Sequence, residues 1–96
     1  MALLTGTEIR AALSTLTGWN HEGDAIAKQF TFAGFPEAVA FVSRLVPDAE
    51  AADHHPDLAI NYRRVRVVYS THSEGGITQK DIAGAHAAEA QARDAR

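Results

Sequence analysis

The chain has 96 residues, no cysteine and a formal net charge of −3 at pH 7. This length allows one domain, residues 1–96, and the lack of cysteine excludes disulfides, thiolate metal sites and cysteine nucleophiles. A mildly acidic chain without a basic block is a poor candidate for binding nucleic acid, and it contains no run of about 20 apolar residues that would predict a membrane span.

The first ten residues combine neither a basic stretch nor a long apolar stretch, so they do not predict a signal peptide. Proteins of reducing compartments rarely depend on disulfides, and a cysteine-free chain fits such a compartment. We therefore expect a small cytoplasmic protein.

Apolar spacing and turn residues predict seven elements in the order α-β-β-α-β-β-α. Thr5 and Glu8 form a capping box at the start of the first helix, and Gly18 is a natural stop at its end. Two strands follow, at 19–21 and 25–32, and the Gly-Asp turn between them predicts a hairpin.

The second helix is predicted from Pro36, which suits the first turn, to Ala52. Pro47 lies inside it and lacks the amide hydrogen, so we expect a kink or an interruption there, with helix resuming beyond it. Pro56 disfavours the helical region for His55, which predicts that the helix ends before this pair.

Alternating apolar and polar residues predict two half-buried strands, at 58–62 and 65–69. Thr78 and Asp81 form a cap-like pair that starts the third helix. Strands with one apolar face pair in antiparallel sheets covered on that face. The expected fold class is therefore α+β, a two-layer sandwich of a four-stranded antiparallel sheet with three helices on one face.

Histidines are the residues that carry candidate chemistry. His54 and His55 lie between the second helix and the third strand, and His72 follows the fourth strand. An imidazole has an ordinary pKa of about 6.5, so it can both donate and accept protons near neutral pH, as general acid–base catalysis requires. If the third and fourth strands pair, the three imidazoles would meet around one cleft.

Simpler interpretations of these residues remain open. The histidine pair before Pro56 could be only a polar loop, Asp81 only a helix cap, and Trp19 only a core residue. A zinc site is disfavoured, because adjacent histidines converge poorly on one ion, although three histidines and a carboxylate would satisfy the ligand count. The sequence contains neither a phosphate-binding glycine loop nor a nucleophile elbow.

One set of residues has a specific spacing: Glu50, His54, His55, Pro56, Tyr62, His72 and Asp81. This pattern resembles the signature of the pterin-4a-carbinolamine dehydratases. The first hairpin also resembles that of the family, in Gly18-Trp19-Asn20 and in Lys28-Gln29-Phe30. The resemblance extends over nearly the whole chain, from about Leu4 to Ala85.

The resemblance implies a hydro-lyase that dehydrates a 4a-hydroxytetrahydropterin to the quinonoid dihydropterin, in the recycling of tetrahydrobiopterin, without a metal or an organic cofactor. It implies that His54 and His72 transfer protons and that His55 binds and orients the pterin ring. The residues implied to border the substrate are Asp53, Pro56, Thr71, Lys80, Asp81 and Trp19.

The resemblance also implies a homodimer, with a tetramer as the other possibility. Pro47 lies on the helix that some members use to form tetramers, which favours the dimer, and pairing of sheet edges would cover otherwise exposed strands. The alternative to an enzyme is a non-catalytic assembly module or transcriptional coactivator of the same fold, a role that requires a surface rather than histidines. The aliphatic residues of 58–61 replace an aromatic pair of animal members, so the identity of the pterin stays open.

Overall fold

The computed structural model describes residues 3–95, and it confirms the predicted order of three helices and four strands. The elements are α1 (Gly6–Leu13), β1 (Asn20–Glu22), β2 (Ala25–Thr31), α2 (Phe35–Ala52), β3 (Asp57–Asn61), β4 (Arg64–Tyr69) and α3 (Gln79–Ala95). A short 3-10 helix, η1 (His72–Glu74), connects β4 to α3.

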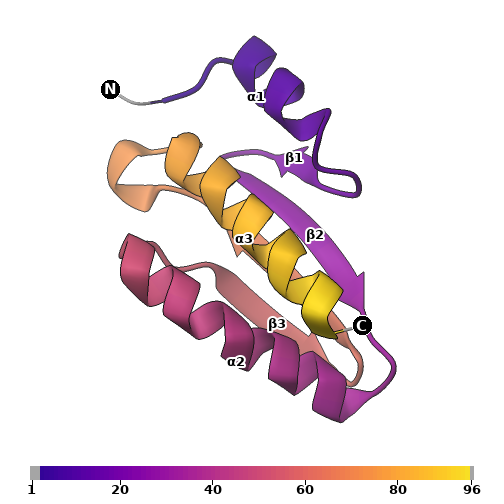
Figure 1. Cartoon of the computed structure of the whole chain (residues 1–96). Coiled ribbons are helices and arrows are strands. Elements are labelled where there is room, and N and C mark those ends of the chain that lie inside the picture. The colour runs from indigo at the N-terminus through magenta and orange to yellow at the C-terminus, as the bar shows by residue number, and fades with distance from the viewer. Residues whose placement is uncertain (1–2, 96) are drawn as a thin grey trace.

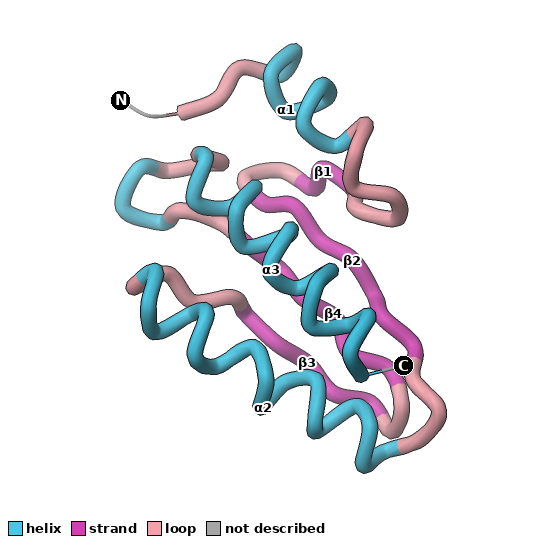
Figure 2. The backbone as a smooth tube through the Cα atoms, viewed as in Figure 1, coloured by secondary structure: helices cyan, strands magenta, loops and turns pink. Residues whose placement is uncertain are grey.

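The four strands form one antiparallel sheet in the order β1-β2-β4-β3, which leaves β1 and β3 at its edges (Figure 2). Helices α2 and α3 run side by side across one face of this sheet, and α1 lies beyond the β1 edge (Figure 1). The predicted α+β class is therefore confirmed.

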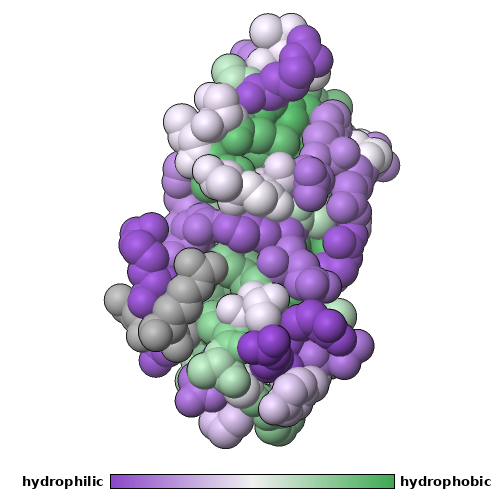
Figure 3. Space-filling view, turned by 90° about the vertical axis from the view of Figure 1, so that its right-hand side faces the viewer, coloured by the Kyte–Doolittle hydropathy of each residue, from purple (hydrophilic) through white to green (hydrophobic). Residues whose placement is uncertain are grey.

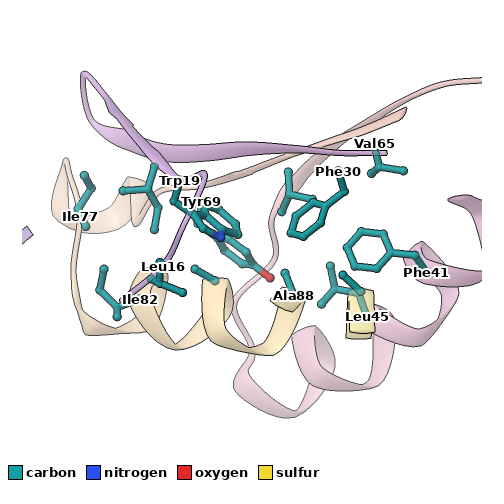
Figure 4. Close-up of a cluster of buried hydrophobic side chains, with 14 of the residues drawn as sticks. Leu16, Trp19, Phe30, Phe41, Leu45, Val65, Tyr69, Ile77, Ile82 and Ala88 are labelled. Atoms are coloured by element: carbon teal, nitrogen blue, oxygen red, sulfur yellow. The ribbon is translucent and has the colours of Figure 1, made fainter. Parts of the chain in front are cut away.

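The core lies between the sheet and the helices (Figure 4). Val65 and Val67 of β4 point into it, as the alternation predicted, while Arg66 between them is exposed. Phe30 of β2 packs against Phe41 of α2, with ring centroids 5.1 Å apart. Burying such a side chain stabilises the fold by about 1.5–3 kcal/mol, so these contacts fix α2 on the sheet.

The first helix is shorter than the sequence predicted. It ends at Leu13, and the residues up to Gly18 form turns instead. The hydroxyls of Ser14 and Thr15 donate hydrogen bonds to the carbonyls three residues earlier, at 2.6 and 2.9 Å. Such local bonds compete with continued helix. Gly18 still adopts a left-handed backbone, with φ of 89°.

The predicted interruption at Pro47 is wrong, because α2 is one continuous helix from Phe35 to Ala52. A proline inside a helix leaves the carbonyl four residues earlier without its amide partner. Here both Pro47 and Ser43, which supplies that carbonyl, lie on the exposed side of the helix. Water can satisfy the carbonyl there, so the helix continues.

The strand predicted at 58–62 is present as β3, but the prediction that it is half-buried is wrong within a single chain. All five residues of β3 are exposed, and Tyr62 lies in the turn that follows, with φ of 57°. Leu58 and Ile60 pair with inward-facing residues of β4, yet they are 38% and 42% exposed. The reason is that β3 lies at the edge of the sheet, where it has a neighbouring strand on one side only.

Helix α3 packs closely against the sheet through small residues. Ala85, Ala88 and Ala92 are fully buried on its inner face. Gly84 lies in the same helix, where glycine costs about 1 kcal/mol relative to alanine. A Cβ atom at Gly84 would lie only 2.6 Å from Cζ of Tyr69, so the position of this ring requires a glycine.

Hydrophobic side chains reach the surface in separate areas. On the face drawn in Figure 3, a band of hydrophilic residues divides two such areas. Within residues 3–95, none of the helices has the length and apolar character to cross a membrane.

Candidate active site

An open hollow of about 420 Å³ lies where the C-terminal end of α2, the end of β4 and the first turn of α3 come together. All three candidate histidines line it, although His72 is far from the other two in the sequence. The residues that line the hollow are Asp53, His54, His55, Ser70, Thr71, His72, Ser73 and Lys80.

The end of α2 positions the histidine pair. Asp53 caps the helix in a left-handed conformation, with φ of 50°. The backbone amides of Asp53 and His54 donate hydrogen bonds to carbonyls in the last turn of α2. The amide of His54 donates to the carbonyl of Ala49, at 3.1 Å. Pro56 disfavours helical backbone at His55. The chain therefore turns sharply at the pair and carries both side chains to the hollow.

A fully buried carboxylate lies behind His54. Asp81 Oδ1 is 2.6 Å from Nε2 of His54, whose side chain is only 11% exposed. The other oxygen, Oδ2, accepts hydrogen bonds from the hydroxyl of Thr71 at 2.7 Å and from the amide of Thr78 at 2.9 Å. Asp81 is thus both the predicted cap of α3 and the partner of His54.

As a carboxylate, Asp81 determines the tautomer of His54. The hydroxyl proton of Thr71 goes to Asp81, so the hydroxyl of Thr78 donates to Thr71, at 2.8 Å. An ionised carboxylate only accepts hydrogen bonds, so Nε2 of His54 carries a proton. Among the described residues, Nδ1 has no hydrogen-bond partner, which makes it the nitrogen available to a ligand.

A tight loop positions His72. The amide of Thr71 donates to the carbonyl of Gly76 at 2.9 Å, and the carbonyl of Thr71 accepts from the amides of Glu74 and Gly75, both at 3.0 Å. Gly75 closes the loop with φ of 79°, a conformation that suits glycine. His72 is exposed at the start of η1, directly after the buried Thr71 that holds Asp81.

His55 is the most open member of the pair. Its Nε2 lies 2.7 Å from Oε2 of Glu50, and both side chains are more than half exposed, at 55% and 70%. A contact this exposed contributes at most about 1 kcal/mol even between charged groups, so its main effect is to restrict the ring. Glu50 belongs to the family-like spacing, and this contact ties its carboxylate to His55.

Pro56 borders a different depression from the histidine hollow. This neighbouring apolar groove, of about 170 Å³, lies between α2 and β3 and meets the hollow at His55. Its lining residues are Val42, Leu45, Val46, Ala49, Glu50, His55, Pro56 and Leu58.

Trp19 does not line the hollow either. It is buried in the core, 6.2 Å from the ring of Tyr69, and its Nε1 donates to Glu89 at 2.9 Å. Lys28 binds the same carboxylate at 2.6 Å. The structure therefore places Trp19 as the core residue that the sequence left open as an alternative.

Ser70 and Ser73 were not predicted as site residues, and they line the hollow on either side of Thr71 and His72. Ser70 donates to the carbonyl of Asp24 in the first hairpin, at 2.7 Å. A single serine beside a histidine carries no distinctive spacing, so only their position next to His72 could have suggested them.

Two further observations limit the chemistry of the site. Among the described side chains, no group of three or more histidines and carboxylates is arranged to hold a metal ion. Burial, together with the nearby carboxylates of Asp48 and Asp81, raises the pKa of Tyr69 well above its ordinary range. Tyr69 therefore keeps its proton at neutral pH and does not act as a base.

Comparison with known proteins gives one consistent match. Residues 2–91 match the family model described as pterin 4 alpha carbinolamine dehydratase. A protein of Mycobacteroides abscessus that is named "Putative pterin-4-alpha-carbinolamine dehydratase" is 50% identical, over 95% of this chain and 97% of its own length. One of the same name from Thermosynechococcus vestitus is 52% identical, over 82% of this chain and 83% of its own length.

Solved structures show the same fold. A crystal structure from Brucella melitensis, described as a transcriptional coactivator/pterin dehydratase, superposes with a TM-score of 0.90 at 40% identity, over 93% of this chain and 97% of that one. A pterin dehydratase-like protein described as a RuBisCO assembly factor in the alpha-carboxysome superposes with a TM-score of 0.63 at 19% identity, over 77% and 86%. The second likeness concerns the fold alone.

Proposed function

Because the chain belongs to the pterin-4a-carbinolamine dehydratase family, we propose that it removes water from a 4a-hydroxytetrahydropterin, giving the quinonoid dihydropterin for tetrahydropterin recycling in the cytoplasm. The observation that carries this proposal is the meeting of His54, His55 and His72 at one hollow, with Asp81 behind His54. The volume of about 420 Å³ lies within the range of small-molecule sites, about 300–1,000 Å³.

The reaction requires two proton transfers and no change of oxidation state. An acid protonates the 4a hydroxyl as the bond between C4a and oxygen breaks, and water leaves with the bonding electrons. A base removes the proton from N5, and the electron pair of that N–H bond forms the double bond between N5 and C4a. Each positioned proton transfer typically accelerates a reaction by about 10²–10⁴-fold.

His54 is the better candidate for the base. Its Nε2 proton is held by Asp81, so Nδ1 is the nitrogen that can take the proton of N5. The buried carboxylate then stabilises the imidazolium that forms, as the aspartate of a catalytic triad does. This role needs no movement of the network around Asp81.

His72 is the corresponding candidate for the acid, because it is exposed on the other strand connection and can regain its proton from solvent. His55, held by Glu50, would bind and orient the pterin ring. Asp53 and Lys80 supply a carboxylate and an ammonium for the amide-like edge of the pterin, which carries both hydrogen-bond donors and an acceptor.

A kinetic assay tests this function. A chemically generated 4a-hydroxytetrahydropterin should lose water faster with the purified protein than in buffer alone, followed by the change in ultraviolet absorbance. The rate should survive a metal chelator, since the mechanism uses histidines only. A rate equal to that in buffer would remove the enzymatic function, and stoichiometric zinc whose removal stops the reaction would overturn the assignment of acid and base.

A non-catalytic assembly module of the same fold remains the competing function. It would use the surface of the molecule, whereas Asp81 holds His54 through a buried and fully paired network that a scaffold does not need. The same assay separates the two functions, because an assembly module would not accelerate the loss of water.

We also propose a homodimer formed through β3. The outer edge of this strand has no partner strand within residues 3–95, and Leu58 and Ile60 beside it are partly exposed apolar residues. A second copy of β3 would continue the sheet and cover both side chains.

Light scattering tests this dimer. It should give the mass of a dimer for the native protein and the mass of a monomer for the double variant Leu58→Lys/Ile60→Lys. The control is Val39→Lys on α2, which should stay dimeric. A native monomer, or a double variant that stays dimeric, would contradict this interface.

A further inference from the structure

Tyr69, the last residue of β4, joins the core to the hollow. The residue is 2% exposed. The rings of Tyr69 and His54 are nearly parallel, with 6.1 Å between their centroids and 19° between their planes. Trp19 packs against it as well, at 6.2 Å. The hydroxyl end of Tyr69 extends away from the sheet toward the helices (Figure 4).

Gly84 provides the space for this ring. A side chain at this position of α3 would overlap with Tyr69, since an added Cβ would lie 2.6 Å from Cζ. Tyr69, Gly84 and His54 together line a second cavity of about 150 Å³ between α2 and α3, separate from the hollow that holds the three histidines. His54 is therefore bordered by Tyr69 on one side and by the substrate hollow on another.

Two contacts of different kinds fix the orientation of His54. The hydrogen bond to Asp81 fixes the position of Nε2, but a single hydrogen bond still allows the ring to tilt. The nearly parallel ring of Tyr69, with its centroid 6.1 Å from that of the imidazole, borders His54 and opposes this tilt. Together they determine where Nδ1 points.

We propose that Tyr69 is a positioning residue for His54 and that it acts through its aromatic ring. The absence of a side chain at Gly84 leaves the space that this ring occupies. This inference rests on the proposed function, because it concerns the histidine that we assign as the base. The hydroxyl is not required: burial and the carboxylates of Asp48 and Asp81 keep the phenol protonated, so it exchanges no proton with His54 at neutral pH.

Two substitutions separate the ring from the hydroxyl. Tyr69→Phe should keep the kcat of the native protein, whereas Tyr69→Leu should lower kcat on the order of tenfold with KM nearly unchanged, because the base is present but misoriented. The matched control is Phe30→Leu. It also removes a buried aromatic ring that contacts Trp19, but among the described residues this ring does not pair with His54. It should keep kcat.

A substrate-free measurement accompanies the kinetics. In proton NMR, the Nε2 proton of His54 should give a slowly exchanging downfield signal in the native protein, in Tyr69→Phe and in Phe30→Leu, and the signal should be lost in Tyr69→Leu. If Tyr69→Leu does not fold, Tyr69→Leu/Gly84→Ala, which refills part of the space, takes its place. A Leu variant that keeps both kcat and the signal, or a Phe variant that loses them equally, would overturn the proposal.

This design also separates two kinds of failure. A native protein that does not accelerate dehydration would end the proposed function, yet the NMR signal of His54 would still report whether Tyr69 holds the ring.

Discussion

Replacing His54 with alanine is expected to lower kcat by about 10²–10⁴-fold, the usual contribution of one positioned proton transfer. The imidazole is held at 2.6 Å by a buried carboxylate, and its second nitrogen is the one available to the substrate. Alanine removes this base and leaves no group that can replace it at the same place. Stopped-flow absorbance with a 4a-hydroxytetrahydropterin measures the loss.

Two further variants make this measurement specific. His72→Ala should lose a similar factor, because it removes the proposed acid from the lining of the hollow. His86→Ala, an exposed histidine of α3 that does not line the hollow, should keep the native kcat. Full activity in His54→Ala would show that His54 is not the base, even if the protein is a dehydratase.

Replacing Asp81 with asparagine should lower both activity and stability. The carboxylate accepts three hydrogen bonds, from His54, Thr71 and Thr78, whereas the amide nitrogen of asparagine can only donate. If that nitrogen faces His54, it imposes the opposite tautomer and places the proton on Nδ1. We expect kcat to fall by up to about 10⁴-fold, which is the cost of the same change in a catalytic triad.

The effect on stability follows from the same network. A buried hydrogen-bonding group left without its partner costs about 1–3 kcal/mol. For a domain of this size each kcal/mol lowers Tm by roughly 4–8 °C, which a thermal melt resolves. The control is Glu89→Gln, a partly buried carboxylate that binds Lys28 and Trp19 away from the hollow. It should lower Tm while kcat stays native, and an Asp81→Asn variant with native kcat would contradict the tautomer argument.

Local patterns were sufficient to predict most of the fold. The capping box of Thr5 and Glu8 and the cap formed by Thr78 and Asp81 begin α1 and α3 as expected. Alternation in β4 correctly identified its buried face. These features are determined by residues close together in the chain, which is why the sequence was enough.

The errors came from contacts that local patterns do not contain. Leu58 and Ile60 alternate like a half-buried strand, but only the order of the strands in the sheet makes β3 an edge. Pro47 suggested a break, but its exposed side of α2 allows water to replace the lost partner. Both outcomes depend on what surrounds the segment in space.

In the site, too, local patterns predicted some features, whereas others depend on contacts between distant residues. The spacing of the histidines predicted a shared cleft, and all three line one hollow. Tyr69 was assigned only as a strand residue, because its contact with His54 depends on Gly84, fifteen positions later, leaving room for the ring. The family resemblance implied that Trp19 and Pro56 border the substrate, yet Trp19 lies in the core and Pro56 lines the apolar groove.

The most direct test is a crystal structure of the protein with a 7,8-dihydropterin, which lacks the 4a hydroxyl and cannot be dehydrated. The ring should lie in the hollow with N5 near Nδ1 of His54 and with C4a on the side of His72. A pterin bound instead in the groove beside Leu58, or one whose N5 lies out of reach of both imidazoles, would contradict the proposed chemistry.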